Sequence, residues 1–132
     1  MSFRSGIRFP GKGRASHILE GAPAHLGGKP GHGHGPGRNL PEGAFPDTWT
    51  DEQVIAAIER VANSPNSSWM MTKGPGQGTL SRGGPLPGAA STTSGGQPVR
   101  YSVRGQDHGL NIEVIVEPTG EGIITGYNKG RW

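Results

Sequence analysis

The sequence predicts an α+β domain, in which an N-terminal helical part with a glycine-rich histidine loop packs on a C-terminal antiparallel sheet. Two patterns carry this prediction. Residues 50–62 show the apolar spacing of an amphipathic helix, and residues 99–127 alternate between apolar and polar side chains, as half-buried strands do. A length of 132 residues suits one domain with one hydrophobic core.

The composition points to a compact core that carries long loops. The chain holds 25 glycines and 12 prolines, and they gather in residues 21–46 and 74–98. There is no cysteine, which excludes disulfides, thiolate nucleophiles and cysteine–zinc sites. The net charge of +3 suits contact with a phosphate backbone and equally an ordinary basic surface.

The order of segments suggests where the domain begins. Residues 1–16 are expected to be a flexible basic arm or linker, and residues 17–132 the folded domain. No apolar run is long enough to span a membrane, and no signal peptide is recognisable at the N-terminus. If the domain is exported, its export signal is therefore expected on a larger protein that contains the domain.

The helix over residues 50–62 has a clear start signal. Thr50 is placed to cap it, and Gln53 at the third helical position completes a capping box. Asp51 and Glu52 in the first turn complement the helix dipole. The side chains expected to face the core are Val54, Ile55, Ile58, Val61 and Ala62.

The rest of the C-terminal half is expected to consist of strands and one loop. A short strand is predicted around Trp69–Met71, followed by a mobile loop over residues 73–97. Three further strands are predicted over residues 99–104, 110–117 and 123–127, with turns at 106–109 and 118–122 between them.

The wetter face of this meander is expected to carry two cations and two carboxylates. Arg100 and Arg104 lie on it beside Glu113 and Glu117. These side chains fit cross-strand ion pairs as well as they fit RNA contacts.

Five histidines are the most informative chemical feature, and two interpretations compete for them. His32 and His34 form an H-x-H pair, with His25 seven residues before the first, which could hold a metal ion. Alternatively, two histidines act as base and acid on RNA. One takes the proton of the 2′-hydroxyl, the other protonates the leaving 5′-oxygen, and a cation stabilises the charged phosphorane.

Four segments in order resemble bacterial EndoU nuclease domains. His17-Ile18-Leu19-Glu20-Gly21 is similar to the family's H-I-L-x-G opening, and a histidine follows 17 positions on in His34-Gly35-Pro36-Gly37-Arg38. The segment 45–50, Phe-Pro-Asp-Thr-Trp-Thr, is similar to F-P-x-x-W-[ST], and 122–127, Gly-Ile-Ile-Thr-Gly-Tyr, to I-I-T-x-Y. Together these segments cover about residues 17–127.

The resemblance implies an EndoU/RNase A-like toxin fold and an endoribonuclease that needs no metal or other cofactor. It implies His17 and His34 as the catalytic pair, without saying which is the base. It also implies that Thr125 binds the scissile phosphate or the base, and that Tyr127 positions the nucleotide. His32 stays a rival to His34, since a shift of two residues is easy in a glycine-rich loop. His25 and His108 are expected to be solvated loop histidines.

One departure from the family leaves the stabilising cation open. Many relatives carry a lysine before F-P-x-x-W, and here Glu42 stands at that position. Arg38 is the first candidate to replace it and Lys73 the second. Alternatively, the domain is a catalytically impaired derivative that binds RNA or protein. A second departure is Asn128, where the family often has proline after the tyrosine, which bears on where the last strand ends.

The expected biology follows from the resemblance. Such domains are often the C-terminal part of a larger polymorphic or contact-dependent toxin, secreted or delivered into the cytoplasm of a target cell. The expected products are 2′,3′-cyclic phosphate and 5′-hydroxyl ends, with tRNA as one candidate substrate. The expected partners are RNA and a cognate immunity protein, and the isolated domain is expected to be a monomer.

Overall fold

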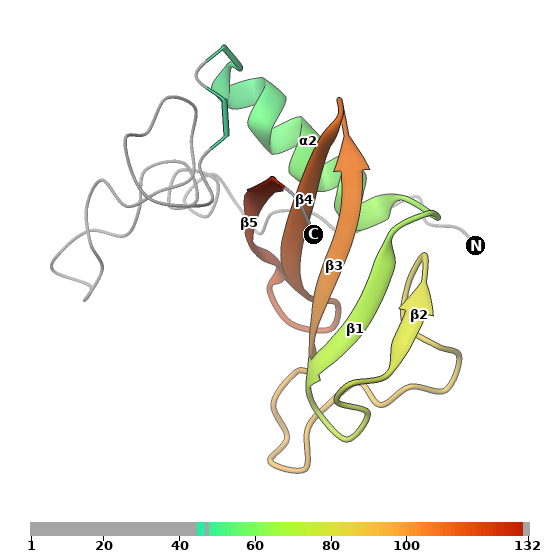
Figure 1. The fold of residues 1–132 in the computed structure, drawn as a ribbon. Helices are drawn as coiled ribbons and strands as arrows, with labels where there is room; N and C mark the ends of the chain where they lie inside the picture. Colours follow the sequence, from blue (N-terminus) through green and yellow to red (C-terminus); the bar gives the residue numbers. More distant parts are fainter. Residues whose placement is uncertain (1–44, 47, 131–132) are drawn as a thin grey trace, which may run out of the picture.

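The computed structural model describes residues 45–46 and 48–130. The predicted arm at residues 1–16 and the histidine loop lie outside this part of the chain. The described part is one helix on a five-stranded antiparallel sheet, which confirms the α+β prediction (Figure 1). No helix in it is long and apolar enough to cross a membrane.

Helix α2 spans Asp51–Asn63 and begins where the capping signal predicts. The Thr50 hydroxyl accepts a hydrogen bond from the Gln53 backbone N–H at 3.1 Å, and the Gln53 side-chain oxygen accepts from the Thr50 N–H at 2.7 Å. Both bonds satisfy donors that a helix start leaves without partners. The predicted capping box is therefore confirmed.

The sheet has the strand order β2-β1-β3-β4-β5, and all neighbouring strands are antiparallel. The strands are β1 (Ser68–Lys73), β2 (Leu80–Arg82), β3 (Arg100–Asp107), β4 (Leu110–Glu117) and β5 (Gly122–Gly130). The three consecutive strands β3, β4 and β5 form the meander that the alternation predicted. The continuation of β5 to Gly130 extends the last strand beyond the predicted end at Tyr127.

The turn between β3 and β4 consists of His108 and Gly109 only, because β3 ends at Asp107 and β4 begins at Leu110. Both residues have positive φ, 51° and 79°. Two successive left-handed residues match the twist of antiparallel strands in a tight hairpin. The predicted turn at residues 106–109 is present and is tighter than the sequence suggested.

The two faces of the sheet differ sharply. The face that includes Trp69, Val103, Val114 and Gly126, called here the helix face, lies under α2. The opposite face, called here the polar face, carries the side chains that alternate with them on each strand. In Figure 1 the helix lies on one side of the sheet only.

The core fills the space between α2 and the helix face. Ile58 at the centre of α2 lies so close to β5 that a Cβ at Gly126 would be 2.9 Å from three of its carbons. The absence of a side chain at Gly126 is what lets the helix approach the sheet. The buried apolar side chains are Phe45, Val54, Ala57, Ile58, Val61, Ala62, Trp69, Met71, Val99, Tyr101, Val103, Ile112, Val114, Val116 and Ile123.

The predicted loop over residues 73–97 is wrong at Leu80–Arg82, which form the edge strand β2 against β1. Three residues between glycine-rich stretches show too little alternation to be recognised as a strand. Their pairing comes from β1, which offers its free edge to them. A further isolated bridge joins Thr92 to Pro98.

Candidate nucleic-acid interface

The predicted site residues fall into two groups. His17, His32, His34 and Arg38 lie outside the described residues, so their roles remain predictions. Thr125, Tyr127 and Lys73 lie within the described sheet and can be placed.

Strand β5 presents both Thr125 and Tyr127 on the polar face. Thr125 is paired with Ile115, and Tyr127 with Glu113. Gly126 between them points to the opposite face and contacts the helix. The spacing of two residues in I-I-T-x-Y therefore puts the threonine and the tyrosine side by side on one surface.

Glu113 is the centre of a polar cluster around Tyr127. Its side chain accepts a hydrogen bond from the Ser102 hydroxyl at 2.5 Å. Its other carboxylate oxygen lies 3.6 Å from both Arg104 Nη2 and Lys129 Nζ. Glu113 is 7% exposed, so this carboxylate is largely shielded from water and is balanced by two cations.

Tyr127 stays protonated at neutral pH in this setting. Burial raises the pKa of its phenol above the usual range, the negative charge of Glu113 and a hydrogen bond with Glu113 raise it further, and Arg104 opposes them. Lys129 Nζ also lies 5.5 Å from the centre of the Tyr127 ring, a cation–π arrangement. The phenol is therefore held as a hydrogen-bond donor beside two positive charges.

Lys73, the second candidate for the stabilising cation, is not brought to this cluster. It ends β1 and pairs with Arg100, and strands β3 and β4 separate β1 from β5. Its ammonium group donates to the Gln97 side chain at 2.8 Å. The cations beside Tyr127 are Arg104, expected on this face, and Lys129, which the sequence reasoning missed.

Lys129 carried a signal that could have found it. Residues 125, 127 and 129 alternate, so a strand that continues past the predicted end must put Lys129 on the face of Tyr127. A last strand that ends at Tyr127 would leave Lys129 outside the sheet, whereas β5 continues to Gly130.

The expected cross-strand ion pairs are present. Arg100 donates to Glu117 at 2.6 Å, and the weaker contact of Arg104 with Glu113 is 3.6 Å long. Both arginine side chains remain more than one third exposed at their outer surfaces. Pairing with a carboxylate therefore leaves part of each guanidinium accessible from the polar face.

Cross-strand pairing arranges the polar face in two rows that run across all five strands. The charged row consists of Arg82, Ser68, Arg104, Glu113 and Tyr127. The apolar row is named for Leu80, Met70 and Ile115, and it also contains Thr125 and the buried Ser102. Because the rows are two residues apart along each strand, roughly 7 Å separates them.

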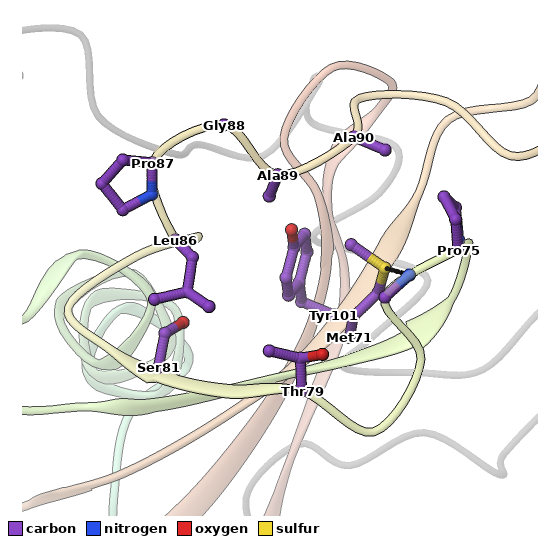
Figure 2. A pocket seen from close by; sticks show the side chains of 11 residues that line it. Met71, Pro75, Thr79, Ser81, Leu86, Pro87, Gly88, Ala89, Ala90 and Tyr101 are labelled. Atoms are coloured by element: carbon purple, nitrogen blue, oxygen red, sulfur yellow. Dashed lines mark hydrogen bonds between the residues drawn. The ribbon is translucent and has the colours of Figure 1, made fainter.

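A separate cavity of about 310 Å³ lies on the helix face, and no residue of α2 lines it (Figure 2). Figure 2 shows the Tyr101 ring at its centre, between Leu86 on one side and Met71 on the other. Burial raises the pKa of Tyr101, so its hydroxyl also stays protonated. This cavity is mainly apolar and opens on the side of the sheet opposite Thr125 and Tyr127.

His108 is the one histidine within the described residues. Its ring lies 66% exposed in the β3–β4 turn, with Nδ1 2.7 Å from Asp107, and its edge contacts Trp49 at 5.8 Å between ring centres. The expectation of an exposed loop histidine is thus met. Within residues 45–46 and 48–130, no three histidine or carboxylate side chains come together as a metal site.

Residues 32–129 match the family described as bacterial EndoU nuclease, and this range includes β1 to β4, all of β5 except Gly130, and the polar cluster. Searches of curated proteins and of solved structures find no match.

Proposed function

The chain belongs to the bacterial EndoU nuclease family, and from this we propose that it is a metal-independent endoribonuclease that uses the polar face of its sheet. One observation carries the proposal: Thr125 and Tyr127 lie in adjacent rows, next to two cations gathered by a shielded carboxylate. This is an arrangement of hydrogen-bond donors and positive charge suited to a phosphodiester.

The proposed reaction uses the nucleophile that RNA supplies. One of His17 and His34 removes the proton of the 2′-hydroxyl, whose oxygen attacks the adjacent phosphorus. The bond to the 5′-oxygen breaks, and the other histidine protonates that oxygen. The products are a 2′,3′-cyclic phosphate and a 5′-hydroxyl, and each histidine is left in the other's starting protonation state.

In this proposal Thr125 contacts the scissile phosphate and Tyr127 positions the nucleotide. The raised pKa of Tyr127 supports its role, because the phenol remains a donor at neutral pH. Glu113 is a positioning residue, since it holds the Tyr127 hydroxyl and gathers Arg104 and Lys129 without facing the substrate openly.

Glu42 stands where many relatives carry a lysine, so another cation must stabilise the charged phosphorane. In this proposal Arg104 and Lys129 are candidates for that role, as is Arg38. Both described cations flank Glu113 and act on Tyr127, Arg104 through its charge and Lys129 over the ring. Lys73 is assigned instead to contact with substrate away from the reacting phosphate, since β3 and β4 separate it from β5.

The proposed context is a toxin domain over residues 17–132, delivered into the cytoplasm of a target cell as part of a larger protein. RNA, with tRNA as one candidate, is the proposed substrate, and a dedicated immunity protein is the proposed inhibitor. The isolated domain is proposed to act as a monomer. These assignments rest on the family resemblance.

The decisive experiment treats total RNA with the purified 132-residue chain in EDTA and analyses the new ends. We expect cleavage with 2′,3′-cyclic phosphate ends, its loss in His17→Ala and His34→Ala, and a rate about 10- to 100-fold lower in Tyr127→Phe. The His32→Ala variant tests the rival histidine.

His108→Ala is the matched control, since it removes an exposed histidine that lies outside the polar cluster. It should cleave at the unchanged rate. Cleavage retained in both His17→Ala and His34→Ala would contradict the proposed mechanism. Binding of RNA without any cleavage would instead identify the impaired derivative.

A further inference from the structure

The charged row continues past the proposed reaction site to an arginine at the far edge of the sheet. Arg82 on β2 is paired with Ser68, which is paired with Arg104, so the side chains of all three lie on the polar face. Arg82 is exposed and forms no ion pair with any residue in the described part of the chain. Four strand spacings, about 19 Å, separate it from Tyr127.

The apolar row ends at the same edge in an unusually exposed side chain. Leu80 is 67% exposed, the largest value among the big apolar side chains of the described residues. Its cross-strand partner is Met70, and Ile115 continues the row towards Thr125; both are partly exposed. Within the described residues Leu80 is not part of the core, which lies with the helix on the other face.

Arg82 and Arg104 in one row, beside Leu80, Met70 and Ile115 in the next, match the two sides of a single nucleic-acid strand. Its phosphates need cations, and its unpaired bases need apolar surfaces on which to lie. A duplex offers its phosphates but keeps its bases stacked inside, so it could not use the apolar row. Among the described residues the polar face also has a positive balance, because Arg82, Arg100, Arg104 and Lys129 outnumber Glu113 and Glu117.

We propose that single-stranded RNA crosses the strands of the polar face from Tyr127 to β2, where Arg82 binds a phosphate remote from the cut and Leu80 contacts a base. This inference rests on the proposed function and extends it to the nucleotides beyond the scissile step. This contact remote from the cut explains why Arg82, which has no ion pair within the described residues, lies next to the exposed Leu80 on a three-residue edge strand.

The test compares substrates of different length on the full chain. One is a dinucleotide containing the cleaved step mapped on total RNA, and the other is a twelve-nucleotide single strand containing the same step. A dinucleotide has a single phosphodiester and cannot contact both ends of the row. We expect Arg82→Ala and Leu80→Ala to leave dinucleotide cleavage unchanged and to lower kcat/KM on the longer strand about five- to tenfold, mainly through KM.

Binding measurements separate the two contacts. The probe is a fluorescein-labelled, fully 2′-O-methylated twelve-nucleotide RNA, which cannot be cut, in single-stranded and duplex form. Arg82→Ala should weaken single-strand binding and lower the slope of log K against log salt by about 0.7. Leu80→Ala should weaken it without changing the slope, and should leave duplex binding unchanged.

Two matched controls lie on the other side of the sheet. Arg60→Ala removes an exposed arginine from α2, and Leu86→Ala removes an exposed leucine that lines the cavity on the helix face. Both should bind and cleave like the parent chain. If Arg82→Ala binds the single strand with the affinity and salt slope of the parent chain, the proposed path is wrong. The path is also wrong if Leu80→Ala weakens duplex binding as much as single-strand binding. Neither result would bear on cleavage itself. Absence of cleavage by the parent chain would instead refute the proposed function.

Discussion

Asp107 ties the β3–β4 turn to helix α2 through a two-pronged ion pair. Arg60 Nε donates to one carboxylate oxygen and Arg60 Nη2 to the other, both at 2.8 Å. The hydrogen bonds from Arg60 lower the pKa of Asp107, with a smaller contribution in the same direction from His108. Bidentate geometry of this kind makes a partly exposed pair more effective than most surface ion pairs.

Replacing Asp107 by asparagine should destabilise the fold at neutral pH by about 1 kcal/mol. Because the folded state holds the pKa of Asp107 below its usual value, the ionised group stabilises the fold above about pH 4 and loses this effect as pH falls through the lowered pKa. Urea unfolding at pH 7 and at pH 3 should show the difference between parent and Asp107→Asn shrinking at the lower pH.

A double-variant comparison controls this prediction. Arg60→Ala should cost a similar amount at pH 7, and Arg60→Ala with Asp107→Asn should cost less than the sum of the two. A difference between parent and Asp107→Asn that stays the same at both pH values would show that the ion pair is not the cause.

Helix α2 and strand β5 meet at Gly126, whose neighbours in sequence are the two proposed site residues of that strand. Ile58 occupies the space where a side chain at Gly126 would lie. Packing that moves β5 therefore moves Thr125 and Tyr127 with it. The position of the helix therefore helps to determine where Thr125 and Tyr127 lie on the polar face.

Gly126→Ala should destabilise the fold by about 1–3 kcal/mol, because the added methyl group overlaps Ile58. Ile58→Ala alone should cost about 2–5 kcal/mol by leaving a cavity. Combined, the two changes should cost clearly less than their sum, since the new methyl group enters the space that Ile58 leaves. Thermal and urea unfolding of the four proteins measure this coupling.

Gly95→Ala is the control for adding a methyl group to a glycine. The nearest atom to a Cβ there is 3.8 Å away, on Thr93, and unfolding should be nearly unchanged. Strict additivity of Gly126→Ala and Ile58→Ala would mean that the two residues do not compete for space.

The sequence predicted those elements whose signals are local. The capping box at Thr50, the alternation around Val103 and Val114, and the cross-strand pairing of Arg100 with Glu117 all follow from residues close in the chain or from strict period two. Strand β2 did not, because Leu80–Arg82 take their conformation from pairing with β1. The strand propensity of three residues does not indicate that they pair with a strand from another part of the sequence.

The candidate site, too, could be predicted from the sequence only where its signals are local. Thr125 and Tyr127 could be assigned to one face from their spacing, and the resemblance gave them a role. The gathering of Arg104, Lys129 and Ser102 around Glu113 brings together residues from three strands, and only the register of β3, β4 and β5 defines it. The separation of Lys73 from Tyr127 could not be predicted for the same reason, since distance along the sequence carries no information on strand order.

Across the described part of the molecule, protection of backbone amides from hydrogen exchange should decrease from the middle of the sheet towards β2. Strands β3 and β4 are hydrogen-bonded on both sides and lie under α2, whereas β2 is an edge strand of three residues. Local opening therefore costs least at β2.

Hydrogen exchange on the full chain should show this order. The amides of Val103 and Val114, whose side chains are fully buried, should exchange slowest, and those of Leu80–Arg82 much faster. Comparable protection in β2 and β4 would mean that the edge strand is held by contacts beyond its pairing with β1. Addition of the uncleavable single strand should slow exchange at β2, while the duplex should not.

The alternation of side chains along each strand separates two kinds of evolutionary constraint. Positions on the helix face, such as Val103 and Val114, must fit the core, while Leu80, Met70 and Ile115 on the opposite face contribute little to it. On the proposed RNA path, preference for flanking nucleotides can therefore diverge among related nucleases through the apolar row without repacking the domain. The same positions are where a designed change of RNA preference should begin.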